Sequence, residues 1–222
     1  MGSLDERFET AGLLPVVVQD ELTGEVRMVA WASREALAKT KQTGRATFFS
    51  RSRSEIWEKG ATSGNAIAVS EVRVDCDEDC LLYAGTPAGP SCHTGQETCF
   101  FRAVRDERGT LVLADAGPPT ALGRLEAVLE ERRESTAEKS YVRSLYDGGP
   151  ARIGAKITEE AGELAAAIAS ESDERVVSEA ADLLFHAMVG LRSRQVPLRR
   201  VLAEIARRMG TSGHDEKRAR GG

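Results

Sequence analysis

The chain has 222 residues, which is enough for one large domain or two small ones. Hydrophobic residues make up 41% and charged residues 29%, so the chain can form a packed core and does not have the composition of a disordered protein. The net charge of −5 disfavours nucleic acid as a partner, because a field of this sign repels a phosphate backbone.

The cellular compartment can be predicted from the absence of targeting signals. No apolar run approaches the ~20 residues that span a bilayer, so we expect no membrane partner. Residues 1–12 are too charged for a signal peptide, and a cytoplasmic location is therefore expected. In that reducing compartment, metal ligation or catalysis is a better role for cysteines than disulfides. The chain has four: Cys76, Cys80, Cys92 and Cys99.

Residues 13–113 alternate short β-branched runs with turns, which predicts an α+β region with a largely antiparallel sheet. One helix is expected within it, over residues 34–43, with Ser33 as the N-cap and Gly44 at the end. A hairpin is expected around residues 106–109.

Beyond this region the pattern changes to helical periodicity. The segment AGPPT lies within residues 116–121, which we predict as a linker. The predicted domains are therefore 1–115, of α+β class, and 122–210, an all-α helical bundle. Residues 211–222 have nothing apolar to bury, and we expect them to be disordered.

Residues 74–80 read VDCDEDC, which interleaves carboxylates, suited to Mg²⁺, with thiols, suited to Zn²⁺. Strand alternation would place Cys76 on one face and Asp75 and Asp77 on the other. In an extended strand the Cα atoms of Asp75 and Asp79 would be ~13 Å apart, too far for one ion, so we expect the chain to turn at residues 77–79. A solvated acidic turn without a metal is the alternative.

The cysteines need a partner further along the chain. Along a strand Cys76 and Cys80 would be ~13 Å apart, which is too far for one zinc ion. Cys92 and Cys99 flank a glycine-containing loop in GPSCHTGQETCF and are better partners for Cys76. Three cysteines and one open position make the ligand count of a catalytic zinc, with Cys80 left over. The alternative is that each thiol is a small core residue.

Residues 13–105 resemble phosphoribosyl-AMP cyclohydrolase, an enzyme of histidine biosynthesis. The segments that carry the resemblance are VQDELTGEVRMVAW, FFSRSRSEIWEKGATSGN, VRVDCDEDCLL and GPSCHTGQETCFFR. The family is dimeric, and the resemblance implies that the three aspartates of residues 75–79 bind Mg²⁺. It also implies a zinc shared across a homodimer, with Cys76 from one subunit and Cys92 and Cys99 from the other.

The chemistry that the resemblance implies is hydrolysis of the adenine ring at C6, which a sugar on N1 leaves electron-poor. Zinc lowers the pKa of its bound water toward ~7, so hydroxide is available at neutral pH. His93 is the candidate general base or proton shuttle; alternatively, it only orients the loop. The family usually has His where Asn65 stands and commonly has Ala where Cys80 stands, which leaves one polar contact in doubt.

Two loops offer cations and hydroxyls for the phosphates of a ribonucleotide, although basic loops are commonly just solvated. These candidate substrate-binding residues are Arg51, Ser52, Arg53, Lys59, Thr62 and Ser63.

The helical half places carboxylates beside its apolar stripes. At 100° per residue, the first long helix is expected to bury one arc: Ile153, Ile157, Leu164 and Ile168. The next helix is expected to bury Val176, Ala180, Leu183, Ala187 and Leu191, with Glu179, Asp182 and His186 along one flank. The flanks of two antiparallel helices can meet, and clustered carboxylates repel unless cations neutralise them, so the spacing favours Mg²⁺. A solvated acidic face with i,i+4 ion pairs is the alternative.

Residues 122–208 resemble phosphoribosyl-ATP pyrophosphohydrolase, one of the all-α nucleoside-triphosphate pyrophosphohydrolases. SYVRSLYDGGPARIGAKITEEAGE and SEAADLLFHAMV carry the likeness, with Val142 in place of a common Thr. The resemblance implies that Mg²⁺ bridges the phosphates and activates water for cleavage between the α and β positions, with Arg152 and Lys156 offsetting charge. The ligands that it implies are Glu159, Glu160, Glu163, Glu179 and Asp182.

Together the halves predict a bifunctional enzyme of histidine biosynthesis that is at least a homodimer. The C-terminal domain would convert phosphoribosyl-ATP to phosphoribosyl-AMP and pyrophosphate, and the N-terminal domain would open the adenine ring of that product. One alternative is a housekeeping nucleotide pyrophosphohydrolase with a non-catalytic, zinc-dependent dimerisation domain. Another is a zinc-clipped dimerisation module attached to a helical interaction domain.

Overall fold

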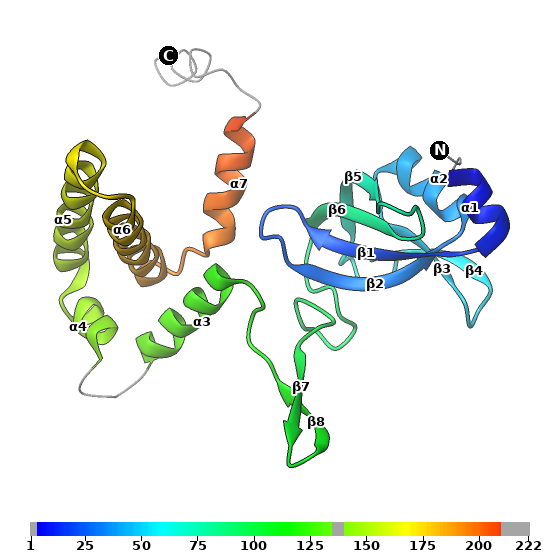
Figure 1. Cartoon of the computed structure of the whole chain (residues 1–222). Coiled ribbons are helices and arrows are strands. Elements are labelled where there is room, and N and C mark those ends of the chain that lie inside the picture. The colour runs from blue at the N-terminus through cyan, green and yellow to red at the C-terminus, as the bar shows by residue number, and fades with distance from the viewer. Residues whose placement is uncertain (1–3, 135–139, 210–222) are drawn as a thin grey trace. The chain divides into compact units, whose positions relative to one another are not determined.

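The computed structural model describes residues 4–134 and 140–209 (Figure 1). The chain forms two compact units, Met1–Thr120 and Ala121–Gly222. The tail predicted to be disordered, residues 211–222, lies outside the described residues. Among the residues that are described, no helix combines the length and the apolar character needed to cross a membrane.

The first unit is rich in strands. Its described elements are, in chain order, α1 (Leu4–Ala11), β1 (Leu14–Asp20), β2 (Val26–Ala32), α2 (Arg34–Thr43), β3 (Thr47–Ser50), β4 (Glu55–Glu58), β5 (Ile67–Val74), β6 (Leu81–Pro87), β7 (Arg102–Glu107) and β8 (Thr110–Asp115).

A four-stranded sheet in the order β2-β1-β6-β5 is the centre of this unit. Strand β1 pairs antiparallel with β2 and parallel with β6, while β6 pairs antiparallel with β5. The predicted antiparallel arrangement is therefore correct except for the β1–β6 pair, which makes the sheet mixed. β3–β4 and β7–β8 are separate antiparallel pairs, and the second is the hairpin predicted around residues 106–109.

The core of the strand unit follows from the alternation in β1. Leu14, Val16 and Val18 are buried on one face of the strand, as its β-branched sequence favours. They join a cluster in which Phe48 stacks on Tyr83 with ring centroids 5.7 Å apart. The sheet therefore rests on a continuous apolar core.

Helix α2 has the predicted bounds and the predicted caps. The Ser33 hydroxyl accepts a hydrogen bond from the backbone N–H of Ala36, which satisfies one of the free donors of the first turn. Gly44 ends the helix at φ +66°, a conformation that favours glycine.

One detail of the predicted strand pattern is wrong. Strand β5 ends at Val74, so Asp75, Cys76 and Asp77 lie in the β5–β6 turn rather than on alternating faces of a strand. The early end has a local cause, because the Asp75 side chain accepts backbone hydrogen bonds that close the turn.

The second unit is helical. Its described elements are α3 (Ala121–Glu134), α4 (Tyr141–Asp147), α5 (Gly149–Ser170), α6 (Asp173–Ser193) and α7 (Leu198–Met209). Helices α5 and α6 pack side by side (Figure 1). The core consists of Leu129, Leu145, Ile153, Met188, Val189 and Leu198.

The predicted buried faces of α5 and α6 are only partly correct. Ile153 is buried and Ile157 packs against the core, but Ile168 is 66% exposed and Ala180 is also exposed. The other predicted core positions, Leu164, Val176, Leu183, Ala187 and Leu191, are half-buried. The reason is that α6 turns a different arc, containing Met188 and Val189, toward α3 and α4. The predicted arc stays partly open to solvent.

Candidate functional site

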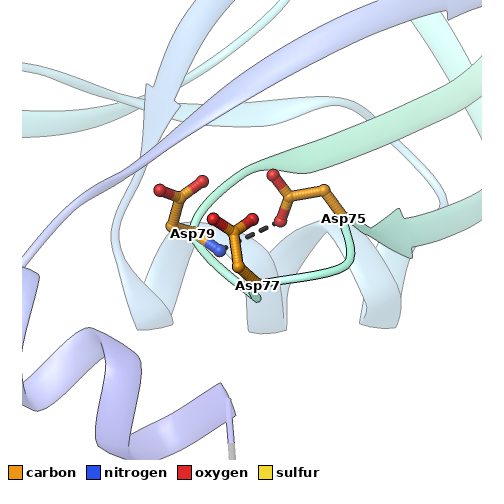
Figure 2. Close-up of side chains that lie close together, drawn as sticks. All are labelled: Asp75, Asp77 and Asp79. Atoms are coloured by element: carbon orange, nitrogen blue, oxygen red, sulfur yellow. Dashed lines mark hydrogen bonds between the residues drawn. The ribbon is translucent and has the colours of Figure 1, made fainter.

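The turn between β5 and β6 gathers three carboxylates (Figure 2). Asp75, Asp77 and Asp79 are all exposed, and each offers an oxygen within 4.8 Å of the others. Asp75 Oδ1 accepts hydrogen bonds from the backbone N–H groups of Asp79 and Cys80, both at 3.0 Å. The chain therefore turns where the spacing of the aspartates requires, and the Asp75 carboxylate holds the turn by accepting hydrogen bonds from its backbone.

The charges in this turn affect one another. The backbone N–H of Cys80 lowers the pKa of Asp75, because it stabilises the ionised carboxylate. The negative charge of Asp77 raises the pKa of Asp79. Three exposed oxygens at this separation suit a hard cation such as Mg²⁺.

A second group of candidate ligands lies in the loop of residues 91–99. Cys92 is buried, and Cys99 is close enough for the two thiols to form a hydrogen bond. The Thr94 hydroxyl donates to Cys92 Sγ at 3.1 Å and lowers the pKa of that thiol. Cys99 is exposed as a residue, but neighbouring protein atoms desolvate its thiol, which is the main cause that raises its pKa to about 11, and the Cys92 thiol adds to it. Two adjacent sulfurs fit part of a zinc site.

Arg27 fastens this loop to the sheet, a role that the sequence analysis did not identify. Its guanidinium is buried against the buried carboxylate of Asp20, with Nε 3.2 Å from Oδ2. The same side chain donates from Nη1 to the backbone carbonyl of Glu97 at 3.1 Å. The Arg27 carbonyl in turn accepts from the Cys99 N–H at 2.8 Å. The sequence signal that could have indicated this role is a single arginine within the otherwise apolar strand β2.

The third predicted zinc ligand, Cys76, is exposed in the acidic turn. Among the described residues, the groups of three or more potential ligands that lie close together do not combine Cys76 with Cys92 and Cys99. Cys80 is half-buried beside the aspartates, and burial raises the pKa of its thiol. Within one chain the loop thus presents two sulfurs.

His93 is exposed, and its Nδ1 lies 3.9 Å from Cys92 Sγ. This position puts an imidazole beside the thiol pair, as a proton shuttle for chemistry at that point would need.

In the strand unit, the predicted substrate-binding residues lie in exposed loops, except for Lys59, which is half-buried. Lys59 is near enough to Cys99 for its positive charge to lower the pKa of that thiol, against the larger effect of desolvation. In the β3–β4 turn, the Arg51 guanidinium lies 4.5 Å above the ring of Trp31, and Arg53 pairs with Glu55 at 2.7 Å. Ser52 lies in the same turn as these arginines, and Thr62 and Ser63 lie in the loop before β5.

The helical unit contains a third group, formed between α5 and α6. Glu160, Glu179 and Asp182 each offer an oxygen within 4.8 Å of the others, and the first two residues are buried. Burial is the largest cause that raises the pKa of Glu179, while Arg175, paired with it at 2.7 Å, opposes the shift. Because buried carboxylates repel strongly, this cluster also fits a divalent cation.

The other predicted carboxylates lie at the edge of the cluster. The Glu163 side chain is hydrogen-bonded to Glu179. Lys156 Nζ bridges Glu159 and Glu160, at 2.9 Å from an oxygen of each, and both carboxylates raise the pKa of this ammonium. Arg152 is exposed one turn earlier on α5. The structure therefore brings three of the five predicted ligands into one group, with Glu163 in contact and Glu159 outside.

Comparison with known families covers both units. Residues 28–101 match the family described as phosphoribosyl-AMP cyclohydrolase. Residues 122–209 match the family described as phosphoribosyl-ATP pyrophosphohydrolase. The first match contains the acidic turn and the cysteine loop, and the second contains the α5–α6 cluster.

Individual proteins match over both units at once. A protein of Thermus thermophilus named histidine biosynthesis bifunctional protein HisIE is 46% identical over 185 residues, which cover 83% of each chain. A protein of the same name from Aquifex aeolicus is 42% identical over 203 residues, covering 91% of this chain and 97% of its own. One from Deinococcus radiodurans is 42% identical over 206 residues, covering 93% of each.

Proposed function

The chain belongs to the HisIE family of bifunctional histidine-biosynthesis enzymes, and from this premise we propose that its two reactions use two kinds of metal centre. It is a hydrolase with phosphoribosyl-ATP pyrophosphohydrolase and phosphoribosyl-AMP cyclohydrolase activities. The observation that carries the proposal is the contrast between the carboxylate group of α5–α6 and the adjacent thiols of Cys92 and Cys99.

The helical unit is proposed to cleave phosphoribosyl-ATP with Mg²⁺. The proposed ligands of the cation are Glu160, Glu179 and Asp182. Glu159 and Glu163 would be further ligands, either of the same cation or of a second one. When bound, Mg²⁺ supplies positive charge that stabilises the charge developing on the phosphates. Residues on the same face of α5 assist: Lys156, once released from its carboxylates, and Arg152 would bind phosphate oxygens.

The strand unit is proposed to open the adenine ring with zinc. Cys92 and Cys99 would supply two thiolates, and Cys76 of the partner subunit the third. When bound, zinc supplies the Lewis acidity that makes a water nucleophilic at neutral pH. His93, beside Cys92, would accept the proton from that water.

Substrate and Mg²⁺ complete this second site. The ribose phosphates would be bound by the cations and hydroxyls of the two loops, Arg51, Ser52, Arg53, Lys59, Thr62 and Ser63. The aspartates of the β5–β6 turn would bind Mg²⁺. A cytoplasmic location, where both substrates would be made and used, is part of the same proposal.

A homodimer is proposed because each unit leaves apolar side chains in solvent. On β7, β8 and the loop before them these are Phe100, Val104, Leu111 and Leu113, each more than half exposed. On α5 and α6 they are Ile168, Val177 and Leu184. Val104 and Leu113 are directly paired across β7 and β8, and adjacent exposed apolar side chains of this kind are typical of surfaces that bind another protein chain.

The assignment of one reaction to each unit is tested by assaying the full-length chain with each substrate separately. Glu160→Gln should abolish pyrophosphate release from phosphoribosyl-ATP and leave ring opening of phosphoribosyl-AMP unchanged. Cys92→Ser should do the reverse. Glu204→Gln, on the solvent face of α7, and Cys80→Ser are the matched controls, and both should retain both activities.

The outcomes separate the proposal from its alternatives. Loss of both reactions in either folded variant would contradict two independent sites. Full ring opening by Cys92→Ser would contradict the assignment of Cys92 to the zinc site, and a wild-type chain that binds zinc without opening the ring would favour the alternative in which the strand unit is only a dimerisation domain. Zinc content measured on the same samples should fall in Cys92→Ser alone.

A further inference from the structure

His186 is a buried, titratable side chain to which the proposed chemistry gives no role. It lies on α6 with only 4% of its surface exposed, one turn beyond Asp182. Its ring makes edge contacts with Tyr141 and Phe185, with interplanar angles of 89° and 88°. Contacts on several sides hold the imidazole in one orientation. A fixed orientation is what a residue that positions a neighbouring site requires.

Both ring nitrogens of His186 have partners. Nδ1 lies 2.9 Å from the backbone carbonyl of Asp182, and because a carbonyl only accepts, Nδ1 carries the proton and donates it. Nε2 of the neutral ring is then an acceptor, and the Tyr141 hydroxyl, at 2.8 Å, donates to it. The tautomer is thus set by partners from two different helices, α4 and α6.

The same ring reaches a candidate metal ligand on a third helix. Nδ1 lies 3.6 Å from Glu160 Oε1, the oxygen that also contacts Lys156 Nζ at 2.9 Å. The protonated nitrogen therefore faces this carboxylate as well as the carbonyl of Asp182. His186 and Lys156 thus approach the same carboxylate oxygen from two helical positions, and this arrangement favours one orientation of the Glu160 side chain.

We propose that Tyr141 and His186 form a positioning pair for the metal ligands of the helical unit. The inference rests on the proposed function, since it concerns the same carboxylates. Tyr141 fixes the ring of His186, and His186 orients the Glu160 side chain and the backbone of Asp182. Neither residue is proposed to touch the substrate. Groups that orient metal ligands in this way change metal affinity or activity by about 10–100-fold when they are removed.

Tyr141→Phe is the variant that tests the pair, because it removes one hydroxyl and keeps the ring that stacks on Phe185, 6.4 Å between centroids. We expect Mn²⁺ to bind the helical site about 10-fold more weakly. We expect kcat for phosphoribosyl-ATP to fall while KM and the melting temperature stay close to wild type. The readouts are Mn²⁺ titration followed by electron paramagnetic resonance, steady-state kinetics and thermal unfolding, all on the full-length chain.

Tyr146→Phe is the matched control. Tyr146 lies on the same helix, α4, and its hydroxyl donates to the backbone carbonyl of Leu129 at 3.2 Å, which joins α4 to α3 instead of to the carboxylates. It should bind Mn²⁺ as the wild type does. Glu160→Gln identifies the phase of the titration that belongs to the helical site.

Each outcome decides something different. If Glu160→Gln weakens Mn²⁺ binding and Tyr141→Phe does not, the positioning pair is wrong and the metal site stands. If Glu160→Gln leaves the titration unchanged, the metal assignment is wrong and the pair with it. An equal loss in Tyr141→Phe and Tyr146→Phe would mean that the hydroxyls of α4 serve only to pack the helix, which also overturns the inference.

Discussion

The acidic turn of β5–β6 and the carboxylate cluster of α5–α6 hold the same number of closely spaced carboxylates in opposite surroundings. All three residues of the turn are exposed and close together in the sequence, and hydrogen bonds from two backbone N–H groups to the Asp75 carboxylate hold the turn. The cluster joins two helices and buries Glu160 and Glu179. Water screens repulsion in the turn, whereas in the cluster the protein itself must offset it. A cation should therefore matter to the stability of the cluster much more than to that of the turn.

The largest effect expected from this difference concerns Glu179. Glu179→Gln should lower pyrophosphohydrolase kcat/KM by about 100-fold, since it removes a proposed ligand. The same change should raise the melting temperature of the metal-free protein by about 2 °C, because a buried charge next to Glu163 and Asp182 is lost. Its ion-pair partner Arg175 is half-exposed and keeps its pair with Glu171.

Asp77→Asn is the counterpart in the turn. It should leave the melting temperature unchanged, since Asp77 is exposed. Differential scanning calorimetry in a chelator measures both variants. A larger stability change in Asp77→Asn than in Glu179→Gln would mean that burial is not what distinguishes the two groups.

The second prediction concerns the pH dependence of metal binding. At pH 7–8 the Cys99 thiol, whose pKa is raised to about 11, is protonated, so zinc must displace that proton. Zinc affinity should therefore rise about 10-fold per pH unit for that thiol alone. Mg²⁺ affinity should stay nearly constant over this range, because the proposed Mg²⁺ ligands of the turn include no thiol proton that must be displaced. Calorimetry in buffers of different ionisation enthalpy counts the protons released, and a pH-independent zinc affinity would contradict the assignment of Cys99.

The smallest effect is on the acid stability of the metal-free protein, and its sign differs between the two groups. Glu179 has a raised pKa, so its contribution is fully present below the ordinary value of 4.5 and is lost as pH rises through the folded-state pKa. Asp75 has a lowered pKa, so its contribution is present above 3.8 and is lost as pH falls further. Between pH 3 and 7, the melting temperature of Glu179→Gln relative to wild type should rise toward neutral pH. The melting temperature of Asp75→Ala relative to wild type should fall over the same range. Added Mg²⁺ should remove the first difference.

The parts of these sites that could be predicted from sequence are those set by short-range geometry. The turn at residues 77–79 follows from the spacing of the aspartates. The flanks that bear Glu160, Glu179 and Asp182 follow from helical periodicity. The resemblance to two families assigned these two patterns to two consecutive reactions, and the matches of the chain to both families agree with that assignment.

The parts that were missed depend on contacts between distant residues. Periodicity placed Ile168 and Ala180 inside, but which arc of a helix is covered depends on its neighbours, and here they cover Met188 and Val189 instead. The contact of Arg27 with Glu97 is likewise invisible to any local pattern.

Arg27 and Thr98 fasten the cysteine loop to β2 through hydrogen bonds that need no metal. The loop therefore loses its conformational entropy when the strand unit folds. The proposed zinc binding would then carry little further entropic cost for ordering the loop. Under the proposed function, in which the partner subunit supplies the third thiolate, association of the two subunits would then be the step that limits zinc binding.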